Sequence, residues 1–342
     1  MKFKSTLRRF ALPALALLAV SCVSEKPAAP VALMPHPSWP LPPDDPRVVF
    51  VKTITGPADI GQTPGFWHRL GNWITGDTGE SENLQKPFGI ALDAAGNLCL
   101  TDTGAGEVCY CDFARKKWLR WDAAGKIHFR LPVAVAHQNG IFYVADSELG
   151  EVLAFHDNGK LAFAVSRPLS RPVGLTIAGD ELFVVDSAAH TVFVFDLAGQ
   201  LRFQFGQRGV GPGEFNFPTH VSTDGHGRLF VTDSMNSRVQ VFDLAGKYLS
   251  EIGSGGDTSG HFGRPKGVAV DAFGHVYVAD ALFDNFQIFD LSGRLLLTIG
   301  EAGTGIGEFG LPNGIAIGAA NQIYVTDCYN HRVQVFKYVG QP

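Results

Sequence analysis

The sequence lacks the basic surplus that a nucleic-acid-binding protein needs. Its 342 residues include 28 lysines and arginines against 33 acidic residues, which gives a formal net charge of −5. Lys2, Lys4, Arg8 and Arg9 belong to a segment that we expect to be removed, which leaves 24 basic residues and a charge of −9. Because binding to phosphate backbones requires a positive surface, the charge excludes DNA and RNA as partners.

Cysteine is also scarce, with five residues in the whole chain. No Cys-x-x-Cys-His motif occurs, so the chain attaches no c-type haem of its own. The segments 209–215 and 303–309 are rich in glycine but lack the lysine and serine/threonine pair of a phosphate-binding loop. We interpret both segments as turns.

The N-terminal apolar run, from Phe10 to Val20, is too short for a comfortable membrane span. Its basic start and the small residue at its end predict a signal peptide over residues 1–21. The sequence Ala19-Val20-Ser21-Cys22 resembles a bacterial lipobox, which implies acylation of Cys22. The alternative is plain secretion with an incidental Cys22. Val23 is not aspartate, which in a Gram-negative cell implies sorting to the outer membrane, facing the periplasm or the cell surface.

Residues 22–45 contain so many prolines that neither a helix nor a central strand is expected there. Such a composition is typical of an extended, semi-rigid spacer. The rest of the chain, with 40 glycines and 26 phenylalanines in the whole sequence, has the many turns and aromatic strand positions of an all-β protein.

A short motif of proline, any residue, a small residue and an apolar residue recurs six times in residues 46–340. The six prolines are Pro87, Pro132, Pro172, Pro218, Pro265 and Pro312. After each comes a predicted strand that ends in aspartate, at Asp102, Asp146, Asp186, Asp233, Asp280 and Asp327. Four short strands in each period predict one propeller blade, and blades must pack side by side to bury their faces.

These repeats resemble NHL repeats, and the sixth carries Asn330-His331-Arg332 after its aspartate. The resemblance implies a six-bladed β-propeller. The last repeat ends after its third strand, so we expect the N-terminal strand that begins near Val48 to complete blade six and close the ring.

In such a propeller, the loops that precede each first strand share one face with the loops after each aspartate. We call this face the channel-mouth face. The residue after each repeat proline is expected to surround the channel, and blades one to three supply apolar residues there. Blades four to six supply the polar candidates for a binding site, which are Thr219, His220, Lys266 and Asn313.

The loops after the aspartates of blades four to six supply further binding candidates, namely Asn236, Arg238, Phe283, Asp284, Tyr329, Asn330 and Arg332. For Asn236, Arg238, Asn330 and Arg332 we favour the alternative that they are turn and packing residues of the repeat. Leu282 and Phe283 replace polar positions of the repeat, and either exposure for binding or inward packing explains them.

Residues 57–85 form the largest departure from the repeat. Aromatic and apolar residues recur there at helical spacing and include Trp67 and Trp73. The two interpretations are a docking element on the channel-mouth face and a helix that fills the seam between blades six and one.

Three cysteines, Cys99, Cys109 and Cys111, fall in blade one. Antiparallel pairing could bring Cys99 opposite one of the other two, and an exported protein can keep a disulfide. We treat these three residues as disulfide candidates.

The expected function is that of a non-catalytic envelope lipoprotein that binds or scaffolds another protein through its channel-mouth face, with no cofactor. The pattern is similar to NHL lipoproteins found beside multihaem cytochrome systems, which implies an electron-transfer assembly. The alternative is a metal-dependent hydrolase or lyase, similar to lactonase or amidating-lyase propellers, with a divalent metal near His220. A catalytic zinc needs three protein ligands, and His220 is the one histidine expected on the ring.

Overall fold

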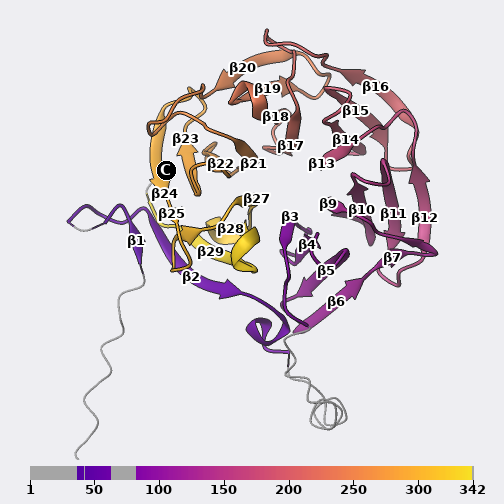
Figure 1. Ribbon diagram of the computed structural model, residues 1–342, viewed down its shortest axis with the longest axis horizontal. Coiled ribbons are helices and arrows are strands. Elements are labelled where there is room, and N and C mark those ends of the chain that lie inside the picture. Colours follow the sequence, from indigo (N-terminus) through magenta and orange to yellow (C-terminus); the bar gives the residue numbers. More distant parts are fainter. Residues whose placement is uncertain (1–36, 42, 63–81, 341–342) are drawn as a thin grey trace, which may run out of the picture. The chain divides into compact units, whose positions relative to one another are not determined.

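The computed structural model describes residues 37–41, 43–62 and 82–340 and shows six antiparallel sheets arranged in a ring, five with four strands and one with five (Figure 1). This confirms the all-β six-bladed propeller expected from the repeats. In each blade the first strand lies next to the central channel and the fourth strand lies on the outside of the ring (Figure 1). Because each sheet has two apolar faces, it is stable only between two neighbours.

Consecutive strands of a blade are neighbours in its sheet. Blade one contains β3 (Pro87–Leu92), β4 (Leu98–Asp102), β5 (Glu107–Asp112) and β6 (Lys117–Trp121). Blade two contains β9 (Pro132–Gln138), β10 (Ile141–Asp146), β11 (Glu151–His156) and β12 (Leu161–Val165). Blade three contains β13 (Pro172–Ala178), β14 (Glu181–Asp186), β15 (Thr191–Asp196) and β16 (Leu201–Phe205).

Blades four and five follow the same order. Blade four contains β17 (Pro218–Thr223), β18 (Arg228–Asp233), β19 (Arg238–Asp243) and β20 (Tyr248–Ile252). Blade five contains β21 (Pro265–Val270), β22 (Val276–Asp280), β23 (Asn285–Phe289) and β24 (Leu295–Ile299). Each second strand ends at the repeat aspartate, as the sequence predicts.

Blade six is assembled from both ends of the described chain. Its strands β27 (Pro312–Ile317), β28 (Gln322–Asp327) and β29 (Arg332–Tyr338) are completed by β2 (Val48–Ile54), which pairs antiparallel with β29. A two-residue strand, β1 (Ser38–Trp39), extends the sheet beyond β2. The expected closure of the ring by an N-terminal strand is therefore confirmed.

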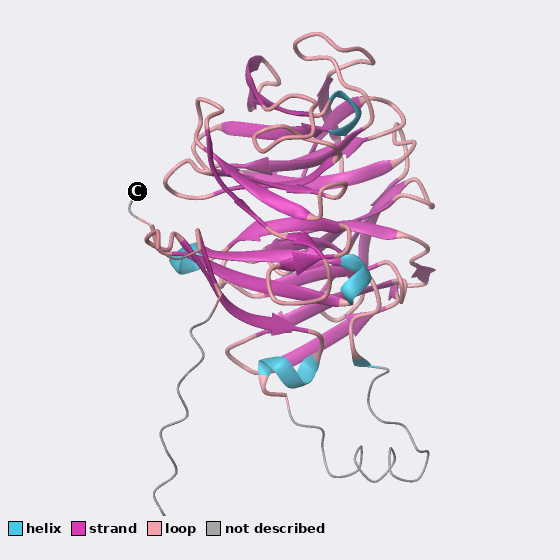
Figure 2. Ribbon diagram, turned by 60° about the vertical axis from the view of Figure 1, so that its left-hand side comes forward, coloured by secondary structure: helices cyan, strands magenta, loops and turns pink. Residues whose placement is uncertain are grey.

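Short elements connect the blades. Two small sheets are formed by β7 (Ala123–Ala124) with β8 (Ile127–His128) and by β25 (Glu301–Ala302) with β26 (Glu308–Phe309). The 3-10 helices are η1 (Pro57–Ile60), η3 (Ser234–Asn236), η4 (Ala319–Asn321) and η5 (Cys328–Asn330), and they lie at the margins of the sheets (Figure 2). In the described part of the chain, no helix has the length and hydrophobicity of a membrane span.

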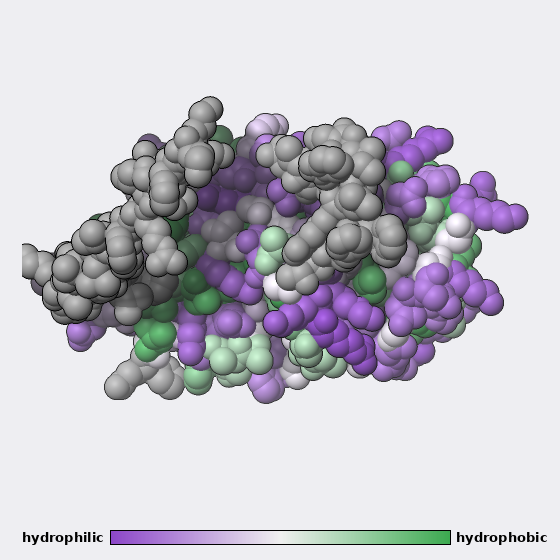
Figure 3. All heavy atoms as spheres, turned by 90° about the horizontal axis from the view of Figure 1, so that it is seen from below, coloured by the Kyte–Doolittle hydropathy of each residue, from purple (hydrophilic) through white to green (hydrophobic). Residues whose placement is uncertain are grey.

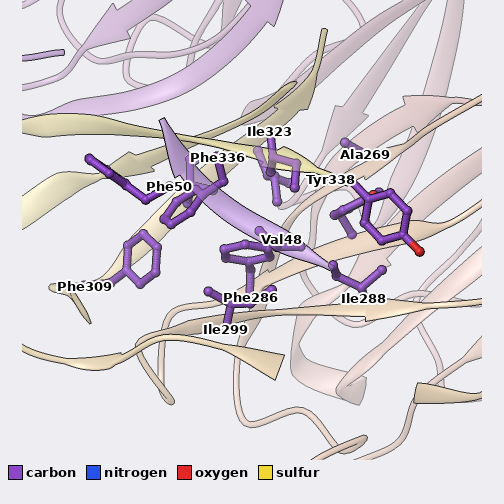
Figure 4. Packing of buried hydrophobic residues seen from close by; sticks show 13 residues of the cluster. Val48, Phe50, Ala269, Phe286, Ile288, Ile299, Phe309, Ile323, Phe336 and Tyr338 are labelled. Carbon is purple, nitrogen blue, oxygen red and sulfur yellow. The ribbon is translucent and has the colours of Figure 1, made fainter. Parts of the chain in front are cut away.

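The hydrophobic core consists of layers between neighbouring blades, one for each of the six contacts around the ring. In the layer between blades five and six, Phe50 of β2 packs edge-on against Phe336 of β29 at a ring-centroid distance of 5.8 Å (Figure 4). Seen edge-on, the outer surface is mixed, with hydrophilic side chains between smaller hydrophobic areas (Figure 3).

Candidate functional site

Every blade has a β-bulge at the proline end of its first strand. In blade one Pro87 pairs with Asp102 and Ile90 pairs with Leu100, so the first strand holds one extra residue. The other five first strands show a register shift at the same place. Because a bulge turns side chains out of the ladder, the residue after each proline is free to face the channel mouth.

The six residues after the repeat prolines line one cavity of about 450 Å³ at the channel mouth. They are Phe88, Val133, Val173, Thr219, Lys266 and Asn313. The structure therefore brings together the ring expected from the sequence, with apolar side chains from blades one to three and polar ones from blades four to six. We call this space the mouth cavity.

His220 marks the inner limit of the mouth cavity. Its side chain lines both this cavity and a second one of about 220 Å³ further along the channel. At the same position, the second residue after the repeat proline, blades one, three, five and six have glycine. The first strands of neighbouring blades lie so close together there that a side chain would meet the next backbone. A Cβ atom on Gly174 would lie 2.8 Å from the carbonyl oxygen of Thr219. His220 is therefore the bulky residue at this level of the channel.

The polar groups around His220 have unused hydrogen-bonding capacity. Both ring nitrogens of His220, Oγ1 of Thr219 and Oδ1 of Asn313 are buried without a hydrogen-bond partner. Burial and, to a smaller extent, the Lys266 ammonium lower the pKa of His220 to about 3, while the Asn313 side chain opposes the shift. His220 is therefore neutral at physiological pH. Unpaired buried polar groups are costly and call for a functional explanation.

Lys266 carries the positive charge at this level of the mouth. Burial lowers its pKa first, and the guanidinium groups of Arg264 and Arg171 lower it further, while Asp280 acts in the opposite direction. Among the described residues Lys266 forms no ion pair.

The repeat aspartates hold the loops of the mouth from behind. All six side chains are completely buried, and each carboxylate accepts hydrogen bonds from backbone groups of the segment before the repeat proline of its own blade. In blade five, for example, Asp280 accepts from the backbone N–H of Arg264 at 2.9 Å and of Leu282 at 3.0 Å. These aspartates are structural groups that fix where the mouth side chains begin.

The asparagine and arginine candidates of blades four and six bind within their own blades. Arg238 donates to Asp233 and to the carbonyl oxygens of Gly211 and Glu214, and Arg332 makes the equivalent contacts with Asp327 and residues 304–308. Asn236 and Asn330 donate to the same aspartates and to Gly209 and Gly303. These four residues anchor the glycine-rich loops, which agrees with the packing interpretation.

The remaining loop candidates divide between exposed and inward positions. Leu282 is 62% exposed and Tyr329 is 59% exposed, whereas Phe283 is half-buried. Asp284 accepts a hydrogen bond from the backbone N–H of Leu311 at 2.7 Å, so it joins blade five to the loop before blade six. Of the apolar pair in blade five, Leu282 thus faces solvent and Phe283 packs partly inward.

The structure corrects the expected disulfide in blade one. Cys99, Cys109 and Cys111 are all free thiols and fully buried. Cys99 lies opposite Tyr110, and its side chain enters the layer toward blade two, whereas Cys109 and Cys111 face blade six. The alternation of side chains along a strand places Cys99 on the other face of the sheet, so it cannot bridge to either partner.

Three of the predicted residues lie outside the described part of the chain: Cys22, Trp67 and Trp73. The described residues of the inserted segment form η1 and the approach to β3. In the described residues no group of three histidine, cysteine or acidic side chains is placed to hold a metal ion.

Sequence reasoning missed three cations of the mouth cavity: Lys86, Arg171 and Arg264. Each directly precedes a repeat proline, so its signal was present in the aligned repeats. The predicted mouth residues, in contrast, follow the prolines.

The fold and this site together define a six-bladed β-propeller with a cavity at the channel mouth. The sequence matches the family described as NHL repeat over residues 309–336 and the family described as 6-bladed beta-propeller over residues 164–226 and 222–281. The chain is an NHL-repeat six-bladed β-propeller. No curated protein is significantly similar to it in sequence.

Similar solved structures include a catalytically inactive virginiamycin B lyase from Staphylococcus aureus with quinupristin (11% identity, TM-score 0.55, covering 74% of this chain and 95% of that one). Hydrazine synthase of Kuenenia stuttgartiensis is 13% identical (TM-score 0.56, 75% and 97%). An auxiliary nutrient binding protein from Bacteroides thetaiotaomicron is 13% identical (TM-score 0.58, 75% and 70%). At these identities the similarity shows the fold alone.

Proposed function

We propose that this protein is a non-catalytic lipoprotein of the cell envelope that binds another envelope protein through its channel-mouth face. The observation that carries the proposal is a rim of exposed apolar side chains on the loops of blades four to six. These side chains are Phe217, Met235, Leu282, Leu311 and Tyr329, and each is more than two-fifths exposed.

The rim residues belong to two sets of loops that meet on one face. The backbone N–H of Met235 donates to the carbonyl oxygen of Asn216 at 3.1 Å, and that of Tyr329 donates to Gly310 at 3.0 Å. These bonds join the loop after each aspartate to the loop before the proline of the same blade. In blades four and six, the rim residues of both loops therefore lie together on the channel-mouth face.

Two rim residues are held in an unfavourable backbone conformation. Phe217 has φ of 48° and Leu311 has φ of 53°, in the left-handed region that bulky residues avoid. Their backbone N–H groups donate to His190 Nδ1 and Asp284 Oδ1 of the preceding blades, which hold the conformation in place. Such local strain is typical of functional sites, and here it keeps apolar side chains in solvent.

A docked protein would cover this rim and remove its apolar side chains from water, which favours association. The partner implied by the surroundings has apolar contact residues next to acidic groups, because the cavity inside the rim is lined by cations. We further propose that this partner belongs to a cytochrome-type electron-transfer assembly.

The test is crosslinking of the full-length protein in intact cell envelopes, with Leu282→Asp as the rim variant. Leu201→Asp, on the outer strand of blade three, is the matched control because Leu201 is 47% exposed. We expect a defined partner to be captured by the wild type and the control and lost in Leu282→Asp. An unchanged partner in Leu282→Asp contradicts the proposed surface.

A separate experiment tests the lipid anchor. Membrane fractionation should show release of a Cys22→Ser variant from the outer membrane.

A further inference from the structure

The residues that directly precede the repeat prolines alternate between cationic and apolar side chains around the ring. Blades one, three and five have Lys86, Arg171 and Arg264, and blades two, four and six have Leu131, Phe217 and Leu311. All three cations line the mouth cavity together with Lys266. Cations therefore reach the mouth from every second blade, separated by apolar groups.

The repeat aspartates fix the backbone of these cations. The backbone N–H groups of Lys86 and Arg171 each donate to the aspartate of their own blade at 2.8 Å, and that of Arg264 does so at 2.9 Å. The carboxylates are thus engaged by backbone groups and completely buried. The backbone of each cation is therefore held at the mouth, with its own aspartate as the acceptor.

None of the described residues that line the mouth cavity is acidic. Within the described chain, none of the four cations has a carboxylate partner within 4.0 Å, and the Lys86 ammonium lies over the Tyr329 ring, 5.1 Å from its centroid. The six aspartates behind the loops supply negative charge, but at Lys266 the repulsion from Arg264 and Arg171 outweighs the attraction of Asp280. An uncompensated cationic cavity in an acidic protein attracts anions.

The floor of the cavity adds unsatisfied polar groups to this charge. His220, whose two ring nitrogens have no partner, and the Asn313 side chain both face the cavity. Hydroxyl groups line its walls, from Thr103, Ser147, Ser187, Thr219 and Ser234. A ligand that accepts hydrogen bonds can be bound by the one N–H group of the neutral His220 ring and by the Thr219 hydroxyl, whereas Asn313 Oδ1 is itself an acceptor.

From these observations we propose that the mouth cavity binds an organic anion with two or more separate carboxylate groups. Because the cations come from alternate blades, they approach from different directions, which suits charges spread over several groups better than one compact phosphate. The volume of about 450 Å³ is that of a small-molecule pocket, and Phe88, Val133 and Val173 provide an apolar wall for the carbon skeleton.

The carboxylates have two chemical sources, a free polycarboxylate and the acidic side chains of a docked protein. The second source rests on the function proposed above, since the same face would be occupied. The first does not need a protein partner.

Isothermal titration calorimetry of the full-length protein with citrate at low ionic strength tests this site. We expect binding to citrate, weaker binding to inorganic phosphate and none to acetate. Arg171→Gln and Lys266→Gln should each weaken citrate binding by about tenfold or more, the loss expected for one charge-assisted contact. Arg202→Gln is the matched control, because it removes the same charge from β16, where Arg202 lies 3.5 Å from Asp180 outside the mouth.

The thermal unfolding curve of each variant shows whether that variant is folded at the temperature of the calorimetric titration. The proposal is overturned if the folded wild type does not bind citrate, if acetate binds as well, or if Arg202→Gln weakens binding as much as Arg171→Gln. Competition of citrate with an aspartate-rich peptide assigns the carboxylates to a protein partner, and failure to compete assigns them to a free anion. Citrate binding retained in Leu282→Asp with loss of the captured partner separates this site from the docking rim.

Discussion

At the scale of single residues, burial decides what each polar side chain can do. His220 and the repeat aspartates are both buried, yet the aspartates accept several backbone hydrogen bonds, whereas no well-formed hydrogen bond reaches either ring nitrogen of His220. Burial of the ring disfavours its charged form and lowers the pKa of His220. The same depth in the protein thus gives hydrogen-bonded anchors at the loops and a neutral ring at the floor of the cavity.

The depressed pKa of His220 predicts a pH-dependent stability. The usual pKa of 6.5 applies when the chain is unfolded, and the folded value is about 3, so the unfolded state binds more protons below pH 6.5. Stability due to this group is present above pH 6.5 and falls as the pH drops toward 3, by at most about 1.4 kcal/mol per pH unit. Lys266, which faces the ring, stays charged throughout this window.

The free energy of unfolding by urea, measured from about pH 6.5 to about pH 4, should therefore fall more steeply in the wild type than in His220→Gln. Other titrating groups contribute equally to both proteins, so the difference in slope isolates this residue. Equal slopes would show that His220 is protonated in the folded state.

At the scale of elements, the connection between the second and third strands of a blade is the unit that builds the mouth. In blade four the connection runs from β18 through η3 to β19, and Asp233 ties it together. Its carboxylate accepts from the backbone N–H of Asn216 at 2.7 Å and from Arg238 Nε at 2.9 Å. Because Arg238 is itself 7% exposed, the carboxylate also neutralises a buried cation.

Replacing Asp233 by asparagine should destabilise the protein by about 3 kcal/mol, because the buried Arg238 then loses its buried carboxylate partner and keeps only Glu251, whose side chain is 44% exposed. Urea unfolding curves provide the measurement. Asp180→Asn is the matched control, since its side chain is 82% exposed and 3.5 Å from Arg202, where an ion pair contributes at most about 1 kcal/mol. A loss in Asp233→Asn no larger than that of the control would mean that the ion pair is not needed.

The bulges belong to this scale too. The proline motif and the aspartate could be recognised in the sequence, and the aspartate marked the end of every second strand. The β-bulges that turn Lys266 and Asn313 into the mouth are register shifts between the first and second strands of a blade. The sequence of one strand does not reveal such a shift, because it depends on how two strands pair.

At the scale of the whole molecule, the ring is held closed by a strand from the N-terminal end. β2 pairs with β29, and its residues Val48 and Phe50 enter the same layer as Phe286 and Phe336 (Figure 4). Closure removes two open sheet edges and completes the channel that the mouth surrounds. The cavity with its four cations exists only in the closed ring, because its walls come from all six blades.

Closure of the ring by β2 predicts that Phe50, which precedes the first repeat proline by many residues, contributes strongly to stability. Phe50→Ala should lower the free energy of unfolding by about 3 kcal/mol, because it empties an aromatic site in the layer between blades five and six. Phe273→Ala is the control, since Phe273 is 47% exposed in a turn of blade five and should change stability by less than about 1 kcal/mol. A negligible effect of Phe50→Ala in urea unfolding would mean that β2 does not close the ring.

The repeated proline motif and the strands ending in aspartate determined the fold by themselves, because a sheet with two apolar faces has to stack on copies of itself. They also placed the residues around the channel. The tertiary structure decided what the sequence left open: Cys99 faces away from Cys109, Arg238 and Arg332 serve their own loops, and Lys86, Arg171 and Arg264 meet in one cavity. The physical reason is that the contacts and the local charge of a side chain depend on residues far away in the sequence. A local sequence pattern does not show which of those residues lie nearby in the folded protein.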